Sequence, residues 1–148
     1  SRRCKSSRLK MNETDTAIYS KLTGGAALMA LLADTDPVSV YSWQALDSAP
    51  YPFVVFNDQA DTEDNDTSHQ IQNMIYQVRG YTKVTMKAAK AIDYQIRLLL
   101  HFASLTVSSH AVLRCERIGS IRFVENQQST DKVYSAGGLY RLIVERTS

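Results

Sequence analysis

The side chains that could do chemistry in this chain are densest in one acidic segment, residues 57–68, with the sequence NDQADTEDNDTS. Its five acidic residues are Asp58, Asp61, Glu63, Asp64 and Asp66. Carboxylates at this density could bind a divalent cation, but an EF-hand loop needs a central glycine and a closing glutamate, and the segment has neither. We therefore expect a solvated loop or hairpin tip, with a weak divalent site and a partner-facing acidic patch as alternatives.

The other reactive residue types show no catalytic pattern. The three histidines, His69, His101 and His110, lack metal-ligand spacing with cysteines or acids. Gly24-Gly25 is not followed by the Lys-Ser/Thr of a P-loop, and no Gly-x-Ser-x-Gly motif occurs. The sequence thus predicts no catalytic residue, no cofactor and no metal site, and the chain is not expected to be an enzyme.

Charge is distributed unevenly along the 148 residues. Five of the 17 basic residues lie within residues 1–10, so the rest of the chain has 12 basic and 15 acidic residues. A mildly acidic body argues against a nucleic-acid-binding face. We expect residues 1–13 to be a basic leader, disordered or non-native, with phosphate contact as the alternative, and residues 14–148 to form a single domain.

Hydrophobic content and cysteine count limit the class of protein further. Hydrophobic residues make up 44% of the chain, and no apolar run reaches the roughly 20 residues that a membrane helix needs. With only Cys4 and Cys115, the sequence predicts no disulfide framework and a reducing compartment, with Cys115 as a small hydrophobic residue.

Two periodicities predict the elements that position these residues. Alternation over residues 70–82 predicts a long strand, and a helical stripe from Ala88 to Leu100 predicts an amphipathic helix over 85–102, capped by Thr85. Thr14 or Asp15 is expected to cap a short first helix. Further strands are expected over residues 38–43, 53–56, 112–118, 120–124 and 133–145. This order predicts an α+β fold: a mainly antiparallel sheet with one long helix packed on a face and short N-terminal helices.

The glycines predict local features of the strands, and the tyrosines suggest a subunit interface. Gly119 is expected at a bulge or bend, and Gly137-Gly138 at a bulge or a close backbone approach. Aromatic residues on strand faces that no helix covers could line a subunit interface. The candidates are Tyr76, Tyr81, Tyr134 and Tyr140.

Taken in order, several short motifs resemble a known family. They are Ile18-Tyr19 with Leu22, Thr23 to Leu28, Val40-Tyr41, Pro50 to Phe56, Gln77 to Tyr81, Ala88 to Leu100, and Ala136 to Arg141. Their order and spacing resemble the tail-completion (tail-terminator) proteins of long-tailed bacteriophages, over about residues 14–146. These are packing motifs, and no catalytic residue carries over.

The resemblance implies a structural virion protein that caps the tail tube as a ring, ends tube polymerisation and joins the tail to the neck proteins. It implies a homo-hexamer that contacts the tube protein and a neck or head-closure protein, while genomic DNA passes through the lumen without specific binding. It places the protein in the tail–neck region of the virion, and in the host cytoplasm during assembly. The acidic segment is expected to project to the lumen or to an axial neighbour.

Two alternatives stay open from the sequence. One is another head–tail connector subunit, such as a head-closure protein, which would share the ring but bind the portal side. The other is a small enzyme or ligand-binding α+β domain, which would need a pocket with convergent polar groups.

Overall fold

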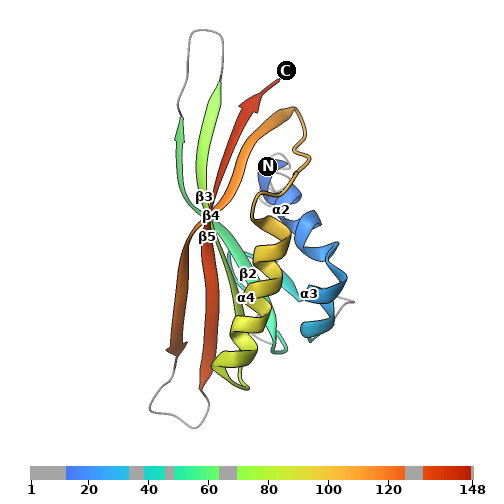
Figure 1. Ribbon diagram of the computed structural model, residues 1–148, viewed down its shortest axis with the longest axis vertical. Helices are drawn as coiled ribbons and strands as arrows, with labels where there is room; N and C mark the ends of the chain where they lie inside the picture. The colour runs from blue at the N-terminus through green and yellow to red at the C-terminus, as the bar shows by residue number, and fades with distance from the viewer. Residues whose placement is uncertain (1–12, 34–38, 46–48, 64–69, 126–131, 148) are drawn as a thin grey trace, which may run out of the picture.

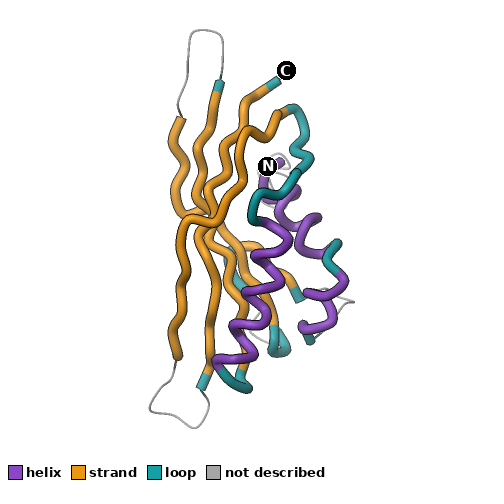
Figure 2. The backbone as a smooth tube through the Cα atoms, in the orientation of Figure 1, coloured by secondary structure: helices purple, strands orange, loops and turns teal. Residues whose placement is uncertain are grey.

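The computed structural model describes residues 13–33, 39–45, 49–63, 70–125 and 132–147, and it has the expected α+β class. Five strands form one mixed sheet in the order β1-β2-β3-β5-β4, with β1 parallel to β2 and all other neighbours antiparallel. The helices lie together on one face of this sheet (Figure 2). The bounds are α2 Glu13–Thr23, α3 Ala26–Leu31, β1 Val40–Ser42, β2 Phe53–Glu63, β3 Ile71–Thr82, α4 Met86–Leu100, β4 His110–Glu125 and β5 Val133–Arg146.

The strand and helix predicted over residues 70–102 are confirmed as β3 and α4. Thr85 has extended backbone geometry, and its hydroxyl accepts a hydrogen bond from the Ala88 N–H at 3.1 Å, so it caps α4 as predicted. The helical stripe packs on the sheet, with Ile92 and Ile96 almost completely buried. None of the helices in the described ranges is long and apolar enough to cross a membrane.

The sheet is long and strongly twisted, and its two main hairpins point to opposite ends of the molecule (Figure 1). The ends of β2 and β3 that carry Glu63 and Ile71 extend past the helices at one end. The ends of β4 and β5 that carry Glu125 and Val133 point to the other end. The β2–β3 hairpin therefore forms an arm that extends past the helices, and the β4–β5 hairpin forms an arm at the other end, where the start of α4 lies alongside β5.

The prediction that the 57–68 segment is a loop is wrong for its first half. β2 continues to Glu63, with Asn57 to Glu63 paired against Gln77 to Gln72 of β3 and a register shift between Asp58 and Ala60. Asp and Asn have low strand propensity, but pairing with a long neighbouring strand overrides that preference. Residues 64–68 of the segment lie outside the described residues.

The expected cap of the first helix is also wrong. Thr14 and Asp15 already lie within α2, and both are buried against β3. The Tyr76 hydroxyl donates a hydrogen bond to Asp15 Oδ1 at 2.5 Å and lies 2.8 Å from the Thr14 hydroxyl. Both side chains therefore contact β3 from within the helix.

The core lies between the helices and one sheet face. Its largest side chains with no exposed surface are Tyr76, Tyr140 and Phe56. Tyr76 and Tyr140 are opposite one another in the β3–β5 register, and both point under the helices. The interpretation of these two tyrosines as subunit-interface residues is therefore wrong: they are core residues.

Gly137 marks a close backbone approach, as predicted for the Gly137-Gly138 pair, and the bulge expected at Gly119 lies in the neighbouring strand β4 between Arg117 and Gly119. A Cβ atom at Gly137 would lie 2.2 Å from the carbonyl oxygen of Val78 on β3. The β3–β5 register runs unbroken past this point, so the two backbones have no freedom to separate locally.

We predict that Gly137→Ala lowers the free energy of unfolding by about 3 kcal/mol, because the added methyl group must displace backbone rather than a flexible side chain. Gly119→Ala is the matched control: its Cβ would meet only Leu139 Cδ1, at 3.9 Å. Urea denaturation of both variants tests this. Equal stability losses in the two variants would contradict the close approach.

Candidate assembly surfaces

The ionisable groups inside the fold are engaged with one another. No three His, Cys, Asp or Glu side chains in the described residues gather in a way that could hold a metal ion. The largest internal group centres on Asp93 of α4 and Arg117 of β4, and a second group joins Asp15 to Tyr76. Their geometry decides whether they are reactive or structural.

Asp93 and Arg117 form a buried two-pronged ion pair. Both Arg117 terminal nitrogens donate to the Asp93 carboxylate, Nη1 to Oδ1 and Nη2 to Oδ2, each at 2.8 Å. The guanidinium also donates to the Tyr140 hydroxyl at 3.0 Å and to the Gly137 carbonyl oxygen at 3.1 Å. Because the two charges are matched in direction and in hydrogen bonding, the pair ties α4 to the sheet.

Gly138 makes room for this pair. A Cβ atom there would lie 2.7 Å from Arg117 Cζ, so only glycine lets the guanidinium lie flat across β5. Burial raises the pKa of the Tyr140 hydroxyl to about 12, although the neighbouring Arg117 charge opposes that shift. Tyr140 therefore stays a neutral hydrogen-bond acceptor for Arg117.

The Asp15–Tyr76 contact is likewise internal. Burial raises the pKa of the Asp15 carboxyl, the Tyr76 hydrogen bond lowers it, and the nearby Asp58 charge raises it. Burial also raises the pKa of Tyr76, and the Asp15 hydrogen bond adds to this. The pair connects the first turn of α2 to the middle of β3, in the dry core, which is a structural role.

Cys115 and His101 form hydrogen bonds that connect β4 to the end of α4. Cys115 is buried, its Sγ donates to the Leu100 carbonyl oxygen at 3.1 Å, and burial raises its pKa to about 11. His101 Nδ1 accepts a hydrogen bond from the Arg117 backbone N–H at 3.0 Å. The expected role of Cys115 as a small hydrophobic residue is confirmed, while Cys4 and His69 lie outside the described residues.

The sheet face without helices carries an aromatic cluster, which we call the open-face cluster. Phe53 is its centre: its ring stacks on Tyr81 with centroids 5.2 Å apart and lies 4.7 Å from Tyr51 and 5.8 Å from Tyr41. The Arg79 guanidinium lies over the Tyr81 ring at 5.4 Å. Burial raises the pKa of Tyr81 and the Arg79 charge lowers it, so Tyr81 is packed into this cluster rather than free.

Trp43 stands at the rim of the open-face cluster and is 61% exposed. Its φ of 68° lies in the left-handed region, which costs a residue with a Cβ about 1–2 kcal/mol. Its backbone N–H nevertheless donates to the Phe56 carbonyl oxygen at 2.8 Å. Trp43, the rings of the open-face cluster and Arg79 line a shallow hollow of about 370 Å³. An exposed tryptophan beside packed aromatic rings is typical of a protein-binding surface.

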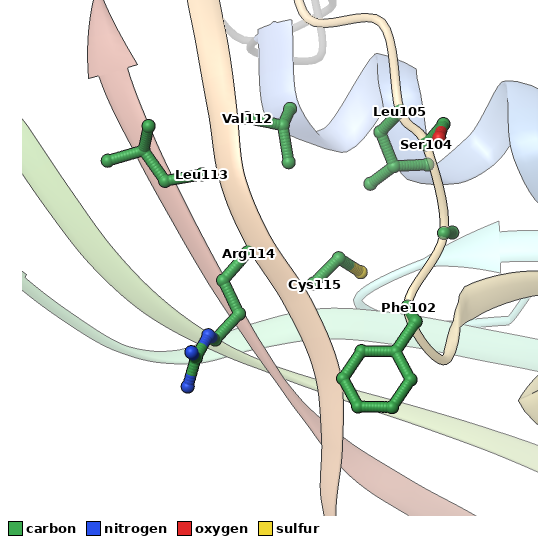
Figure 3. Close-up of a pocket in the computed structure, with 8 residues that line it drawn as sticks. Phe102, Ser104, Leu105, Val112, Leu113, Arg114 and Cys115 are labelled. Atoms are coloured by element: carbon green, nitrogen blue, oxygen red, sulfur yellow. The ribbon is translucent and has the colours of Figure 1, made fainter.

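A second hollow, of about 420 Å³, lies between β4 and the segment after α4 (Figure 3). Val112, Leu105 and Cys115 point into it, whereas Leu113 and Arg114 point away on the other side of β4. The register shift between Val112 and Arg114 is the reason that the consecutive side chains of Leu113 and Arg114 lie on the same side of β4. Its lining also includes the Phe102 ring and Ser104. Among the described residues, no histidine or carboxylate lines it beside the buried Cys115, so it does not have the nucleophile and base of a reaction site.

The predicted site residues are scattered in the structure. Asp58, Asp61 and Glu63 lie on β2, while Asp64 and Asp66 fall outside the described residues. Of the tyrosines, Tyr81 belongs to the open-face cluster, and Tyr134 is half-buried near the start of β5, on the helix side of the sheet. An interface role for these two stays a prediction. The prediction missed Trp43, Tyr51, Phe53 and Arg79, because only the pairing of β1, β2 and β3 brings them together.

Comparisons with known proteins agree with a structural role. The family model described as "Tail completion protein gp17" matches residues 16–141. Among solved structures, a chain in "Virion of native gene transfer agent (GTA) particle" is similar, with a TM-score of 0.70 and 19% identity, over 88% of this chain and 92% of that chain. At that identity the likeness shows the fold alone. No curated protein is significantly similar to this chain.

We predict that Arg117→Met lowers the free energy of unfolding by about 3–5 kcal/mol, because it leaves the Asp93 carboxylate buried without its partner. The double variant Asp93→Leu/Arg117→Met should recover most of that loss, since it removes both charges. Thermal and urea denaturation of the two variants measure this. A single variant within about 1 kcal/mol of the unmodified chain would contradict a structural role for the pair.

Proposed function

Because this chain belongs to the tail completion protein gp17 family, we propose that it forms a ring that caps the tail tube, ends tube polymerisation and joins the tail to the neck proteins. A tail-associated structural role in a phage-like virion follows from the family itself. The ring and its two axial contacts are the finer part of the proposal. The observation that carries it is the family match across residues 16–141, nearly all of the described domain.

The internal chemistry supports a structural protein rather than an enzyme. Two pairs hold their polar atoms together within the core: Arg117 with Asp93, and Tyr76 with Asp15. The two hollows described above are shallow and open, and neither gathers a nucleophile and a base. The features that reach the surface are instead aromatic rings, sheet edges and hairpin arms, which are the means by which subunits bind one another.

The shape of the subunit supports a ring. A closed ring needs two different patches on each subunit, one for each neighbour. The single sheet has two unlike edges, short β1 beside β2 on one side and long β4 on the other. We propose a homo-hexamer, with Tyr81 and Tyr134 near subunit contacts.

The arms suggest how the ring meets its axial partners. The β2–β3 and β4–β5 hairpins point to opposite ends of the molecule (Figure 1). One arm would meet the tube protein and the other a neck or head-closure protein. The excess of acidic over basic residues after residue 10 would repel DNA that passes through the lumen, which fits transit without specific binding. The protein would assemble in the host cytoplasm and remain in the tail–neck region.

The proposal is tested by mass measurement and electron microscopy of the purified chain, alone and mixed with the tail-tube protein of the same virion. We expect rings of about six subunits, or tube ends that carry a cap and stop growing. Tube protein alone is the control for free growth. A chain that ignores tube ends but binds the portal side would indicate a head-closure role, and a chain that binds neither would contradict a neck role altogether.

Trp43 gives a sharper test of the open-face cluster. Trp43→Gly should leave the free energy of unfolding within about 1 kcal/mol of the unmodified chain, because relief of strain at a φ of 68° offsets the loss of the partly buried indole, yet it should weaken ring formation or tube capping. Ser109→Gly is the matched control, since Ser109 is exposed and has a φ of 60° but no aromatic ring. It should gain about 1 kcal/mol of stability and assemble normally. Normal assembly of Trp43→Gly would remove the cluster from the proposed interface.

A further inference from the structure

One flank of α4 is exposed and mixes cations with large apolar side chains. Lys90 and Arg97 lie three residues before and four after Asp93, so they share its side of the helix. Asp93 contacts Arg117 of β4, so its side of α4 faces β4. A Cβ atom at Gly25 would meet Leu99, so the opposite side of α4 faces the α2–α3 turn. The flank with Lys90 and Arg97 is therefore turned toward the β4 edge of the molecule.

This surface, which we call the α4 flank, is apolar enough to bind protein. Tyr94 and Leu98 are each 58% exposed, and Phe102, just past the helix end, is 71% exposed. Arg122 of β4 adds a further cation, with Nη2 3.8 Å from Asp93 Oδ2 and much of its side chain in solvent. The members of the α4 flank are Lys90, Tyr94, Arg97, Leu98, Phe102 and Arg122.

The α4 flank carries a net positive charge. Asp93 is the only acidic residue of α4, and it is buried and matched by Arg117. A segment of like charge with aromatic and aliphatic side chains between its cations fits an acidic protein surface. DNA phosphates would make no use of three exposed apolar side chains.

The opposite edge of the same sheet has the complementary charge. β1 pairs only with Val54 to Phe56, so in the described residues no strand pairs with the outer side of β2 from Asn57 to Glu63. That stretch contains Asp58, Asp61 and Glu63 and no lysine or arginine. Asp58 and Asp61 are opposite Tyr76 and Met74, whose side chains point to the helix layer. We call this stretch the β2 edge.

We propose that the α4 flank of one subunit binds the β2 edge of a second copy, head to tail. The two surfaces lie at opposite edges of one sheet, on the same side of it, and their charges are complementary, which is what a heterologous contact in a closed ring requires. This inference rests on the proposed ring and names the surfaces through which its neighbours meet.

A charge-swap experiment on the full chain tests the contact. Variant F carries Lys90→Glu and Arg97→Glu, and variant E carries Asp58→Lys and Asp61→Lys. Each variant alone would place like charges across every contact, so its self-association should weaken by at least about tenfold. In a mixture of F and E, every F–E contact is complementary again, and association should return. The chain with all four substitutions should likewise associate with itself.

Association is measured by sedimentation of the chain alone at low salt, and by capping of tail-tube ends, since a tube end can act as a template. Lys21→Glu/Lys132→Glu makes the same net charge change as variant F outside both surfaces and should associate normally. Circular dichroism confirms that each variant is folded.

The outcomes separate this contact from the proposed function. Rescue in the F–E mixture supports the contact, whether or not tubes are capped. Rings or caps that form from F alone and E alone, or a mixture that stays dissociated while the unmodified chain assembles, overturn the contact and leave the ring intact. An unmodified chain that is monomeric with and without tube ends overturns both. Salt-sensitive binding of duplex DNA, lost in F but not in E, would assign the α4 flank to nucleic acid instead.

Discussion

The buried pair between Asp93 and Arg117 is the interaction on which the arrangement of this fold most depends. It joins the helix layer to the edge half of the sheet at a point where three elements of structure meet: α4, β4 and β5, the last through the Tyr140 hydroxyl and the Gly137 carbonyl oxygen. Two charges in a dry site are unfavourable unless their geometry is complete, so the pair tolerates little displacement of α4 relative to β4. Gly138 in β5 follows from this need, since a side chain there would occupy the space of the guanidinium.

The division of the sheet into two unlike faces follows from the same packing. The helix side has enough apolar area to be dry, so its tyrosines, Tyr76 and Tyr140, are buried with their hydroxyls bonded internally. The other side is covered only by its own aromatic rings around Phe53 and remains partly open to solvent. A domain built this way presents preformed surfaces at its edges and on its open face. That agrees with the structural role of its family.

Much of this architecture can be predicted from the sequence, and the failures share one cause. The alternation in β3, the stripe of α4 and the Thr85 cap are local patterns, and all three are confirmed. β2 was predicted too short because its acidic half has no strand propensity of its own and depends on pairing with β3. Period-2 alternation separates two faces of a strand without showing which one the helices cover, and so Tyr76 and Tyr140 were placed on the wrong side. The Asp93–Arg117 pair joins residues on separate elements, and no local spacing indicates it.

The strand order has a consequence for how the subunit is made on the ribosome. β5 is the last of the described strands along the chain, yet it lies inside the sheet, between β3 and β4. Until β5 has emerged, β4 has no partner in the sheet and the two halves of the domain are not joined. Pairing β3 with β5 joins residues such as Ile71 and Glu145, so the step is non-local and comes late in folding. A nascent chain without β5 therefore lacks both pairings that join the two halves of the sheet.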